Sequence, residues 1–259
     1  MTRYLFEDNP TEREWNRMRL IERALDGESF ALLGHAGIGA GSTCLEVGAG
    51  AGSIVEWMAE RVGPSGHVLA VDKKTVHLQR FNNPPVRVLE GNLTDLTLDR
   101  PVDVAHARYV LIHNANDRAL LEMIRSAVHP GGMVVLEEPD FTSAAYLQLD
   151  QDEAIRRVNH AICKKFMDSG LDPAYGLRLP QRMRDAGFDV QRVESRLHVC
   201  EGGAPIADLM AESVLILRET YTQTGLATDV DIDHYAARAR DPGRWAVFYA
   251  TVSVLARAA

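Results

Sequence analysis

The residues whose types and spacing could do chemistry are concentrated in one glycine-rich segment. Gly48, Gly50 and Gly52 alternate with small residues after a mostly apolar run, and Glu46 stands two residues before the first glycine. Glycine in a turn between a strand and a helix lets the backbone approach a ligand closely. The N–H groups of the first helical turn then point at that ligand. The segment therefore predicts a binding site for a nucleotide-like cofactor.

Two cofactor classes use a turn of this kind. The dinucleotide fingerprint is GxGxxG, and its third glycine would fall at position 53, where this chain has Ser53. The chain instead has GxGxG with a preceding acid. This pattern resembles motif I of the class I S-adenosylmethionine-dependent methyltransferases, in which the glycines make room for the methionine part of the cofactor. The resemblance implies S-adenosylmethionine, with a nicotinamide cofactor as the alternative.

Further segments match the same family in their order and spacing. Asp72 ends a second apolar run, where the resemblance implies a carboxylate that accepts both ribose hydroxyls. A third run ends at Gly91-Asn92, where the family places an Asp or Asn near the adenine. Segments 102–108 and 129–132 resemble its fourth-strand motif and its Lys-Pro-Gly-Gly turn. Together these matches make the resemblance specific over about half of the chain.

The cofactor-binding prediction combines the glycine turn with residues at the ends of the next strands. It comprises Tyr4, Glu46, Gly48, Gly50, Gly52, Asp72, Lys73, Gly91, Asn92, Leu93, Ala107 and Arg108. Tyr4 would fold over the cofactor as part of an N-terminal lid, and a disordered terminus is the alternative. For Arg108 the alternative is a structural ion pair with a nearby carboxylate.

His113 is predicted as the catalytic base. It follows the fourth strand in segment 109–117, on the edge where doubly wound folds bind ligands. The segment resembles the His-Asp segment of small-molecule O-methyltransferases, in which that histidine is often the base, but Asn114 stands here in place of the Asp. A phenol has a pKa near ~10 and gains from a positioned base. The alternative is a histidine that only packs or caps a helix.

An acidic cluster, Glu137-Glu138-Pro139-Asp140, follows the fifth strand. Adjacent carboxylates repel unless one is protonated or paired, so Glu138 is predicted to bind a cationic or hydroxyl group of the acceptor. A solvent-facing loop is the alternative. Phe141 is predicted to line an apolar acceptor pocket. Further side chains that could line it, or could simply belong to the core, are Tyr146, Phe166, Met167, Tyr175, Met210 and Trp245.

The elements that must position these residues alternate between strands and helices. Strands are predicted at 43–47, 67–72, 86–89, 102–107 and 133–137, and helices at 53–62, 74–81 and 116–128. Nearly continuous apolar strands that alternate with helices imply a parallel sheet covered on both faces. The predicted class is therefore α/β with a doubly wound sheet. The resemblance adds a seven-stranded, mostly parallel, Rossmann-like sheet, closed by a hairpin of strands 190–200 and 248–256.

The chain is predicted to form a single domain with four parts. These are N-terminal cap helices at 1–41, a cofactor-binding core at 42–142, a lid at 143–180 and the C-terminal part of the core at 181–259. Two helices are expected before Gly34, and a further helix is expected at 154–167 in the lid. The cap helices and the lid would enclose the substrate at the carboxyl edge of the sheet.

Composition limits the partners and the location. The 259 residues include 28 Lys and Arg against 36 Asp and Glu, for a formal charge of −8, which argues against nucleic acid as the main partner. No group of residues has metal-ligand spacing, and the three cysteines are widely separated. There is no apolar stretch of membrane-spanning length and no secretion signal, so the expected location is the cytoplasm, away from membranes.

These features predict an S-adenosylmethionine-dependent methyltransferase that acts on a small organic molecule, with O-methylation of a secondary metabolite as the leading hypothesis. Three alternatives stay open: N- or C-methyl transfer with the same fold, a NAD(P)-dependent oxidoreductase, and a non-enzymatic cofactor-binding protein. Because lid helices of related enzymes often dimerise, the resemblance also implies a homodimer.

Overall fold

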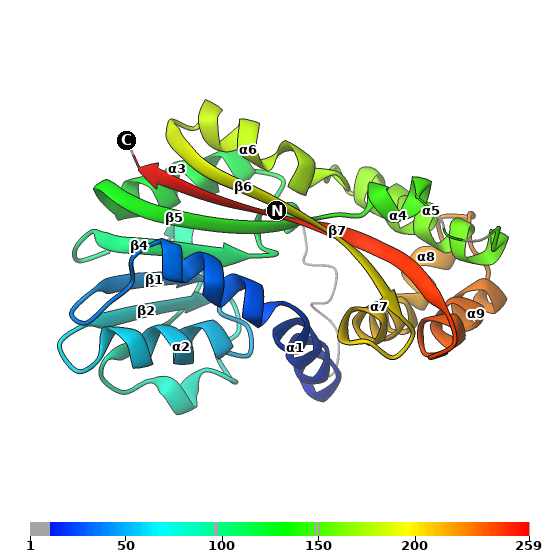
Figure 1. The fold of residues 1–259 in the computed structure, drawn as a ribbon, viewed down its shortest axis with the longest axis horizontal. Helices are drawn as coiled ribbons and strands as arrows, with labels where there is room; N and C mark the ends of the chain where they lie inside the picture. The colour runs from blue at the N-terminus through cyan, green and yellow to red at the C-terminus, as the bar shows by residue number, and fades with distance from the viewer. Residues whose placement is uncertain (1–10, 96–97, 148, 150, 259) are drawn as a thin grey trace.

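Seven strands form one sheet in the order β3-β2-β1-β4-β5-β7-β6 (Figure 1). The computed structural model describes residues 11–95, 98–147, 149 and 151–258. The strands are β1 (Thr43–Val47), β2 (His67–Asp72), β3 (Val86–Glu90), β4 (Val102–Arg108), β5 (Val128–Asp140), β6 (Phe188–Glu201) and β7 (Trp245–Ala258). Strands β1 to β5 are parallel, and β7 runs antiparallel to β5 and β6. The predicted doubly wound, mostly parallel sheet is confirmed.

The helices follow the predicted alternation with two exceptions. They are α1 (Thr11–His35), α2 (Ser53–Val62), α3 (Asp117–Ala127), α4 (Thr142–Tyr146), α5 (Glu153–Asp168), α6 (Tyr175–Asp185), α7 (Pro205–Ile216), α8 (Arg218–Thr222) and α9 (Asp229–Ala239). The two helices expected before Gly34 are one helix of 25 residues, α1. The prediction of a helix at 74–81 was also wrong, because only Gln79–Phe81 form a short 3₁₀ turn.

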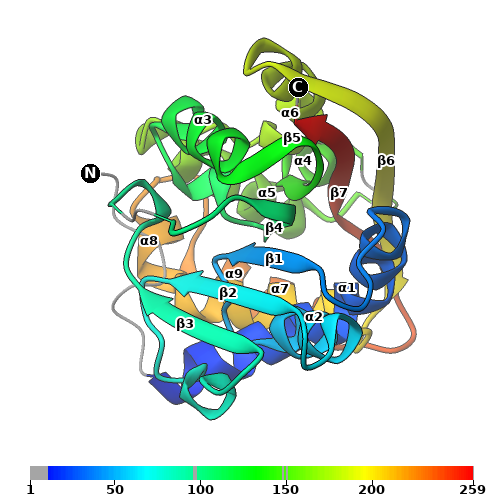
Figure 2. The same ribbon diagram turned by 90° about the vertical axis from the view of Figure 1, so that its left-hand side faces the viewer.

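Helices cover both faces of the sheet (Figure 2). Helix α2 and the C-terminal half of α1 pack on one face, while α3 and α6 pack on the other. Side chains alternate between these layers: Cys44 faces the α1 and α2 side, and Leu45 faces the α3 side. The carboxyl ends of β1 to β4 therefore meet at one edge, where the predicted site residues lie.

Helices α5, α7, α8 and α9, here called the cap, stand beyond that edge of the sheet (Figure 1). Residues 205–239, expected in the C-terminal part of the core, form the cap helices α7, α8 and α9. They lie between β6 and β7, whose long hairpin extends away from the core. Helix α7 packs on α1 and α9, and α5 packs on α8 and α9. The sequence analysis did not predict the place of these helices over the site.

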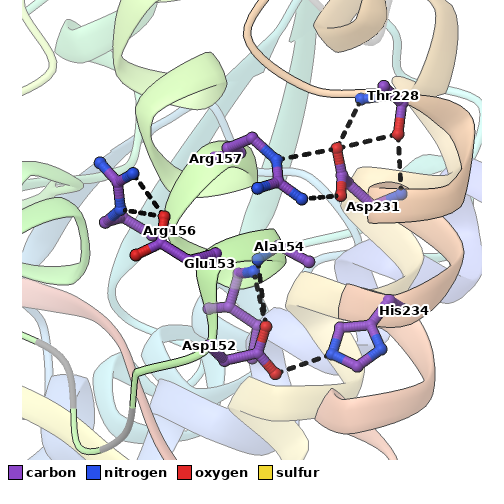
Figure 3. Close-up of polar contacts among 9 residues, drawn as sticks. Asp152, Glu153, Ala154, Arg156, Arg157, Thr228, Asp231 and His234 are labelled. Carbon is purple, nitrogen blue, oxygen red and sulfur yellow. Dashed lines mark hydrogen bonds and ion pairs between the residues drawn. The ribbon is translucent and has the colours of Figure 1, made fainter.

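Polar contacts join α5 to α9 at the surface of the cap (Figure 3). Asp152 caps α5 by accepting hydrogen bonds from the N–H groups of Ala154 and Ile155, and its other oxygen lies 2.7 Å from Nε2 of His234. Arg157 donates to Asp231, with the shorter contact at 2.6 Å. These contacts fix how α5 is oriented against α9.

Candidate active site

A cavity of about 340 Å³ lies between the carboxyl edge of the sheet, helix α1 and the cap. Its volume falls in the range of roughly 300–1,000 Å³ that is usual for ligand pockets. The glycine turn and the ends of β2 and β3 line one end, and aromatic residues near His113 line another part. The predicted site residues that line it are Glu46, Gly48, Gly50, Asp72, Lys73, Gly91, Asn92, Leu93, Arg108, His113 and Phe141. Tyr4 lies outside the described residues.

The three glycines of the turn have different surroundings. Gly50 lines the cavity with φ of 54°, in the left-handed region that favours glycine. Gly48 also lines the cavity, but a Cβ there would lie 2.4 Å from Cγ2 of Val110. Gly52 does not line it, and a Cβ there would lie 2.4 Å from the ring of Phe81. Side-chain packing thus requires glycine at position 52, and its predicted cofactor contact stays a prediction.

Asp72 ends β2 with its carboxylate facing the cavity. One oxygen accepts a hydrogen bond of 2.9 Å from the backbone N–H of Gly50, and the other accepts one of 2.9 Å from the backbone N–H of Lys74. Burial raises the pKa of Asp72, and these backbone donors oppose that shift. Because each carboxylate oxygen accepts more than one hydrogen bond, capacity remains for two hydroxyl donors. Asp72 therefore ties the end of β2 to the glycine turn and presents acceptors to a ligand.

The fourth strand delivers two neighbouring residues to opposite faces. Arg108 lines the cavity and donates to Oγ of Ser29 at 2.8 Å and to Oδ1 of Asp26 at 2.9 Å. Ala107 points into the α3 side of the core, is fully buried and does not line the cavity. The side chain of Ala107 points away from the cavity because side chains alternate along a strand, and its predicted cofactor contact stays a prediction.

Helix α1 closes one side of the cavity over the glycine turn. Glu22 accepts a hydrogen bond of 2.9 Å from the N–H of Ser53, and Asp26 accepts one of 3.0 Å from the Ser53 hydroxyl. Helix α1 also contributes Arg17 and Met18 to the lining. The sequence analysis did not identify Arg17, Glu22 or Asp26 as site residues. Their spacing along one helical face was the available signal.

His113 lies in a 3₁₀ turn after β4 that Glu138 holds in place. Oε1 of Glu138 accepts from the N–H groups of Val110 and Leu111 at 3.0 and 2.7 Å, and Oε2 accepts from Ile112 at 3.1 Å. Glu138 is fully buried and does not line the cavity. The oxygens of Glu138 anchor the turn that presents His113, and its predicted contact with substrate stays a prediction.

The imidazole of His113 faces the cavity, with its ring centroid 6.1 Å from that of Phe166. Burial, together with the charges of Arg17 and Lys73, lowers the pKa of His113 to about 3. The ring is therefore neutral at pH 7 and can accept a hydrogen bond from a substrate hydroxyl. The same low pKa makes it a weak proton acceptor.

The other carboxylates of the acidic cluster are engaged elsewhere. Glu137 lies within hydrogen-bonding distance of His106, at 3.0 Å, and Asp140 accepts from the N–H and hydroxyl groups of Thr142 and Ser143. Both carboxylates are buried outside the cavity. The cluster is therefore not a solvent-facing loop, and both carboxylates have partners inside the protein.

Aromatic side chains form the wall of the cavity near His113. Phe141 lies between Phe166 and Tyr249, with ring centroids 5.2 and 5.5 Å away. Met210 of α7 also lines this wall. Of the remaining candidates, Tyr146, Met167 and Trp245 are exposed and Tyr175 is buried outside the cavity. This wall suits an apolar or aromatic acceptor.

Tyr109 is a wall residue that the sequence analysis did not find. Its φ is 59°, rare for a residue with a side chain. Its hydroxyl lies 3.2 Å from that of Tyr249 and 2.5 Å from Oγ1 of Thr251 on β7. Strained backbone held by surrounding contacts is frequent at functional sites. No signal in the sequence indicates a left-handed tyrosine after a strand.

Within the described ranges, no group of His, Cys, Asp or Glu could hold a metal ion. Over the same residues, no helix is both long and apolar enough to cross a bilayer.

Comparison with known proteins assigns the family. A model of the methyltransferase domain family matches residues 16–193, which is more than half of the chain. The chain belongs to the methyltransferase domain family. This family match confirms the predicted class I S-adenosylmethionine-dependent methyltransferase and its cofactor. The match decides against the nicotinamide alternative.

The methyltransferase domain is similar to curated proteins from a bacterium and a fungus. It is 30% identical over 159 residues to an uncharacterized 37.1 kDa protein in transposon Tn4556 of Streptomyces fradiae, covering 59% of this chain and 45% of that protein. It is 27% identical over 198 residues to methyltransferase str3 of Strobilurus tenacellus, covering 71% of this chain and 68% of that protein. The chain thus spans less than half of the Streptomyces protein.

Among solved structures, the methyltransferase domain resembles the cyclopropane synthase MmaA2 from Mycobacterium tuberculosis. The TM-score is 0.58 at 17% identity, with 99% of this chain and 90% of that chain covered. At this identity the likeness concerns the fold, and it agrees with the observed sheet order.

The site residues fit the cofactor of the family. Asp72 presents a carboxylate with acceptor capacity to the cavity, Gly50 presents backbone, and Glu46 places a carboxylate at the same end. Asn92 and Leu93 line the next strand end, where the Asn92 amide donates to Asp95 at 2.8 Å. These donors and acceptors match the hydroxyls and the ammonium of S-adenosylmethionine.

Proposed function

We propose that this methyltransferase domain transfers the methyl group of S-adenosylmethionine to a hydroxyl of a small organic acceptor of secondary metabolism. The observation that carries this proposal is the single cavity that joins Asp72 and the glycine turn to the aromatic wall beside His113. One cavity thus offers a polar end for the cofactor and an apolar end for an acceptor. The small-molecule partner, the homodimer and the cytoplasmic location expected from the sequence stay predictions.

Some residues of the chain bind the cofactor, and others exclude water from the acceptor. S-adenosylmethionine, when bound, supplies a methyl group on a sulfonium that already carries its leaving group. Asp72 accepts hydrogen bonds from ribose hydroxyls, and the ring of Phe141 and its neighbours keep water from the acceptor. Alignment of two bound reactants accounts for much of the rate of such a displacement.

His113 is the proposed catalytic residue, as the hydrogen-bond acceptor that orients the substrate hydroxyl. Its neutral ring faces the cavity on a turn that Glu138 fixes. The low pKa of His113, about 3, favours this orienting role over full proton abstraction. The same observation favours the second candidate function, transfer to nitrogen or carbon, in which His113 is not needed.

Binding of the cofactor is tested first, by calorimetry with S-adenosylmethionine and S-adenosylhomocysteine. Asp72→Asn should weaken both about 10–100-fold, the loss expected for hydrogen bonds to a charged group. Asp99→Asn, at the exposed Arg87–Asp99 pair, is the matched control and should leave binding unchanged. Absence of binding to the unmodified protein at millimolar cofactor would end the proposal.

Turnover is then measured on a panel of phenols, carboxylic acids and amines. We expect methylated phenols, and His113→Ala should lower kcat by about 10²-fold or more. Full activity of His113→Ala on an amine or carbon acceptor would establish the second candidate. Cofactor binding without any turnover would favour a non-enzymatic cofactor-binding protein.

A further inference from the structure

A fully buried histidine that the proposed mechanism does not use lies next to the cofactor end of the cavity. His106, on β4, is 0% exposed. Its Nδ1 lies 2.6 Å from Oε2 of Glu46 on β1, and its Nε2 lies 3.0 Å from Oε1 of Glu137 on β5. Three adjacent strands thus hold a carboxylate, an imidazole and a carboxylate in one line.

When both carboxylates are ionised, the two contacts need both ring nitrogens of His106 to donate. A carboxylate that is ionised only accepts hydrogen bonds, so an imidazole placed between two carboxylates satisfies both as an imidazolium. Burial opposes this charge, but Glu46 and Glu137 outweigh it and raise the pKa of His106 to about 9. Burial also disfavours the charge on Glu137. The hydrogen bond and the charge of His106 outweigh burial and lower the pKa of Glu137.

Glu46 is in a different position from Glu137. Burial raises the pKa of Glu46, and the adjacent His106 is the largest influence that opposes this rise. Glu46 lines the cavity, whereas His106 and Glu137 do not. The charge state of a carboxylate that faces the ligand therefore depends on an imidazolium behind it.

The surrounding groups complete the charge balance. From α1, Asp26 pairs with Arg108 at 2.9 Å, and Glu28 pairs with Arg196 of β6. From β7, the hydroxyl of Ser253 donates to the second oxygen of Glu137 at 2.9 Å. Glu137 is thus held by its own partners, and Arg108 adds a second cation near both carboxylates.

We propose that His106 is a positioning residue that keeps Glu46 ionised and directed into the cavity, where Glu46 binds the amino-acid ammonium group of S-adenosylmethionine. This inference rests on the proposed function. Without the imidazolium, the buried Glu46 takes up a proton and offers the ammonium group no charge. His106 therefore controls affinity for the amino-acid part of the cofactor and not for its nucleoside.

The test compares two ligands that differ in the amino-acid part. S-adenosylhomocysteine carries the ammonium group, and 5′-methylthioadenosine lacks it. By calorimetry at pH 7.5, His106→Gln and Glu46→Gln should each weaken S-adenosylhomocysteine about 10-fold or more, and 5′-methylthioadenosine less than 2-fold. His129→Gln, which alters the exposed His129–Asp103 contact, is the matched control and should change neither affinity.

A spectroscopic measurement on the unmodified protein does not depend on the folding of a variant. The ¹⁵N spectrum of the histidine rings, assigned by loss of one signal in His106→Gln or by through-bond contacts in the native protein, should show both nitrogens of His106 protonated at pH 7.5. A neutral His106 ring would overturn the inference.

The binding outcomes separate this inference from the proposed function. If the unmodified protein binds neither ligand, the proposed function fails. If it binds both, and Glu46→Gln weakens both equally or weakens neither, the inference alone is overturned and the cofactor site stands.

Discussion

Two histidine–carboxylate contacts in this methyltransferase domain differ mainly in their burial. His106 lies between Glu46 and Glu137 inside the sheet, where all three side chains are at most 3% exposed. His234 contacts Asp152 on the cap surface at 2.7 Å, with its side chain 44% exposed (Figure 3). The distances are similar, but water can replace the partner only at the surface.

This difference indicates what each contact is for. Breaking a buried pair leaves a charge with neither water nor partner, whereas an exposed pair is exchanged for hydration at little cost. The buried network also adjoins the cofactor end of the cavity, and the surface contact only orients α5 against α9. The comparison predicts large effects of substitution in the sheet and small ones in the cap.

The largest effect is expected for Glu137→Ala. It leaves the His106 imidazolium without one of its two carboxylates, and loss of a partner from a buried pair costs about 3–5 kcal/mol of unfolding free energy. Urea denaturation measures this change. His129→Gln, at an exposed pair, should cost less than about 1 kcal/mol. Equal effects of the two substitutions would remove the distinction between the regions.

The pH dependence of stability should carry the same signature. The folded protein holds the His106 proton up to about pH 9, while an unfolded histidine releases it near 6.5. The contribution of His106 to the free energy of unfolding is therefore fully present below about pH 6.5. It is lost as pH rises through about 9, and the loss is on the order of 2–3 kcal/mol. Burial also raises the pKa of Glu138 to about 8, which makes stability fall between about pH 4.5 and 8.

Thermal or urea unfolding at pH 6.5 and pH 9 measures that loss, and His106→Gln isolates the contribution of His106. The variant should show a clearly smaller fall than the unmodified protein. An unchanged slope would mean that His106 does not carry the charge.

The next effect is expected for Glu138→Ala, in the turn that presents His113. The substitution removes the acceptor of three backbone N–H groups and should lower the free energy of unfolding by about 1–3 kcal/mol or more. Glu153→Ala, at an exposed pair on α5, is the control and should leave the unfolding free energy nearly unchanged. Because the turn carries His113, kcat should fall in Glu138→Ala while cofactor affinity is retained. Loss of cofactor affinity alone would contradict this role.

The smallest effect is expected in the cap. Asp152→Ala removes the N-terminal cap of α5 and the contact with His234. It should lower the free energy of unfolding by about 1 kcal/mol. Asp152→Asn keeps a capping oxygen and removes the charge, so it should cost a few tenths of a kcal/mol. A larger loss in Asp152→Asn than in Asp152→Ala would show that charge, and not capping, dominates this surface.

The sequence by itself determined the order of strands and helices in the core. The strand and helix at 43–62 and the strand at 67–72 agree with the prediction, because each is a short apolar run ended by glycine or by a polar residue. The glycine turn and Asp72 reached the cavity for the same reason, since the carboxyl ends of parallel strands share one edge. These features depend on local pattern and on few possible connections.

Only the tertiary structure decided which neighbours share a site. Ala107 and Arg108 are adjacent in sequence but lie on opposite faces, and Glu138 accepts hydrogen bonds from the backbone N–H groups of the turn before His113. The His106 network joins three strands far apart along the chain, and α7 and α8, which lie between β6 and β7, contribute Met210 and Tyr221 to the cavity. Burial, side-chain direction and long-range contact decide such roles, and the one-dimensional pattern of the sequence contains none of them directly.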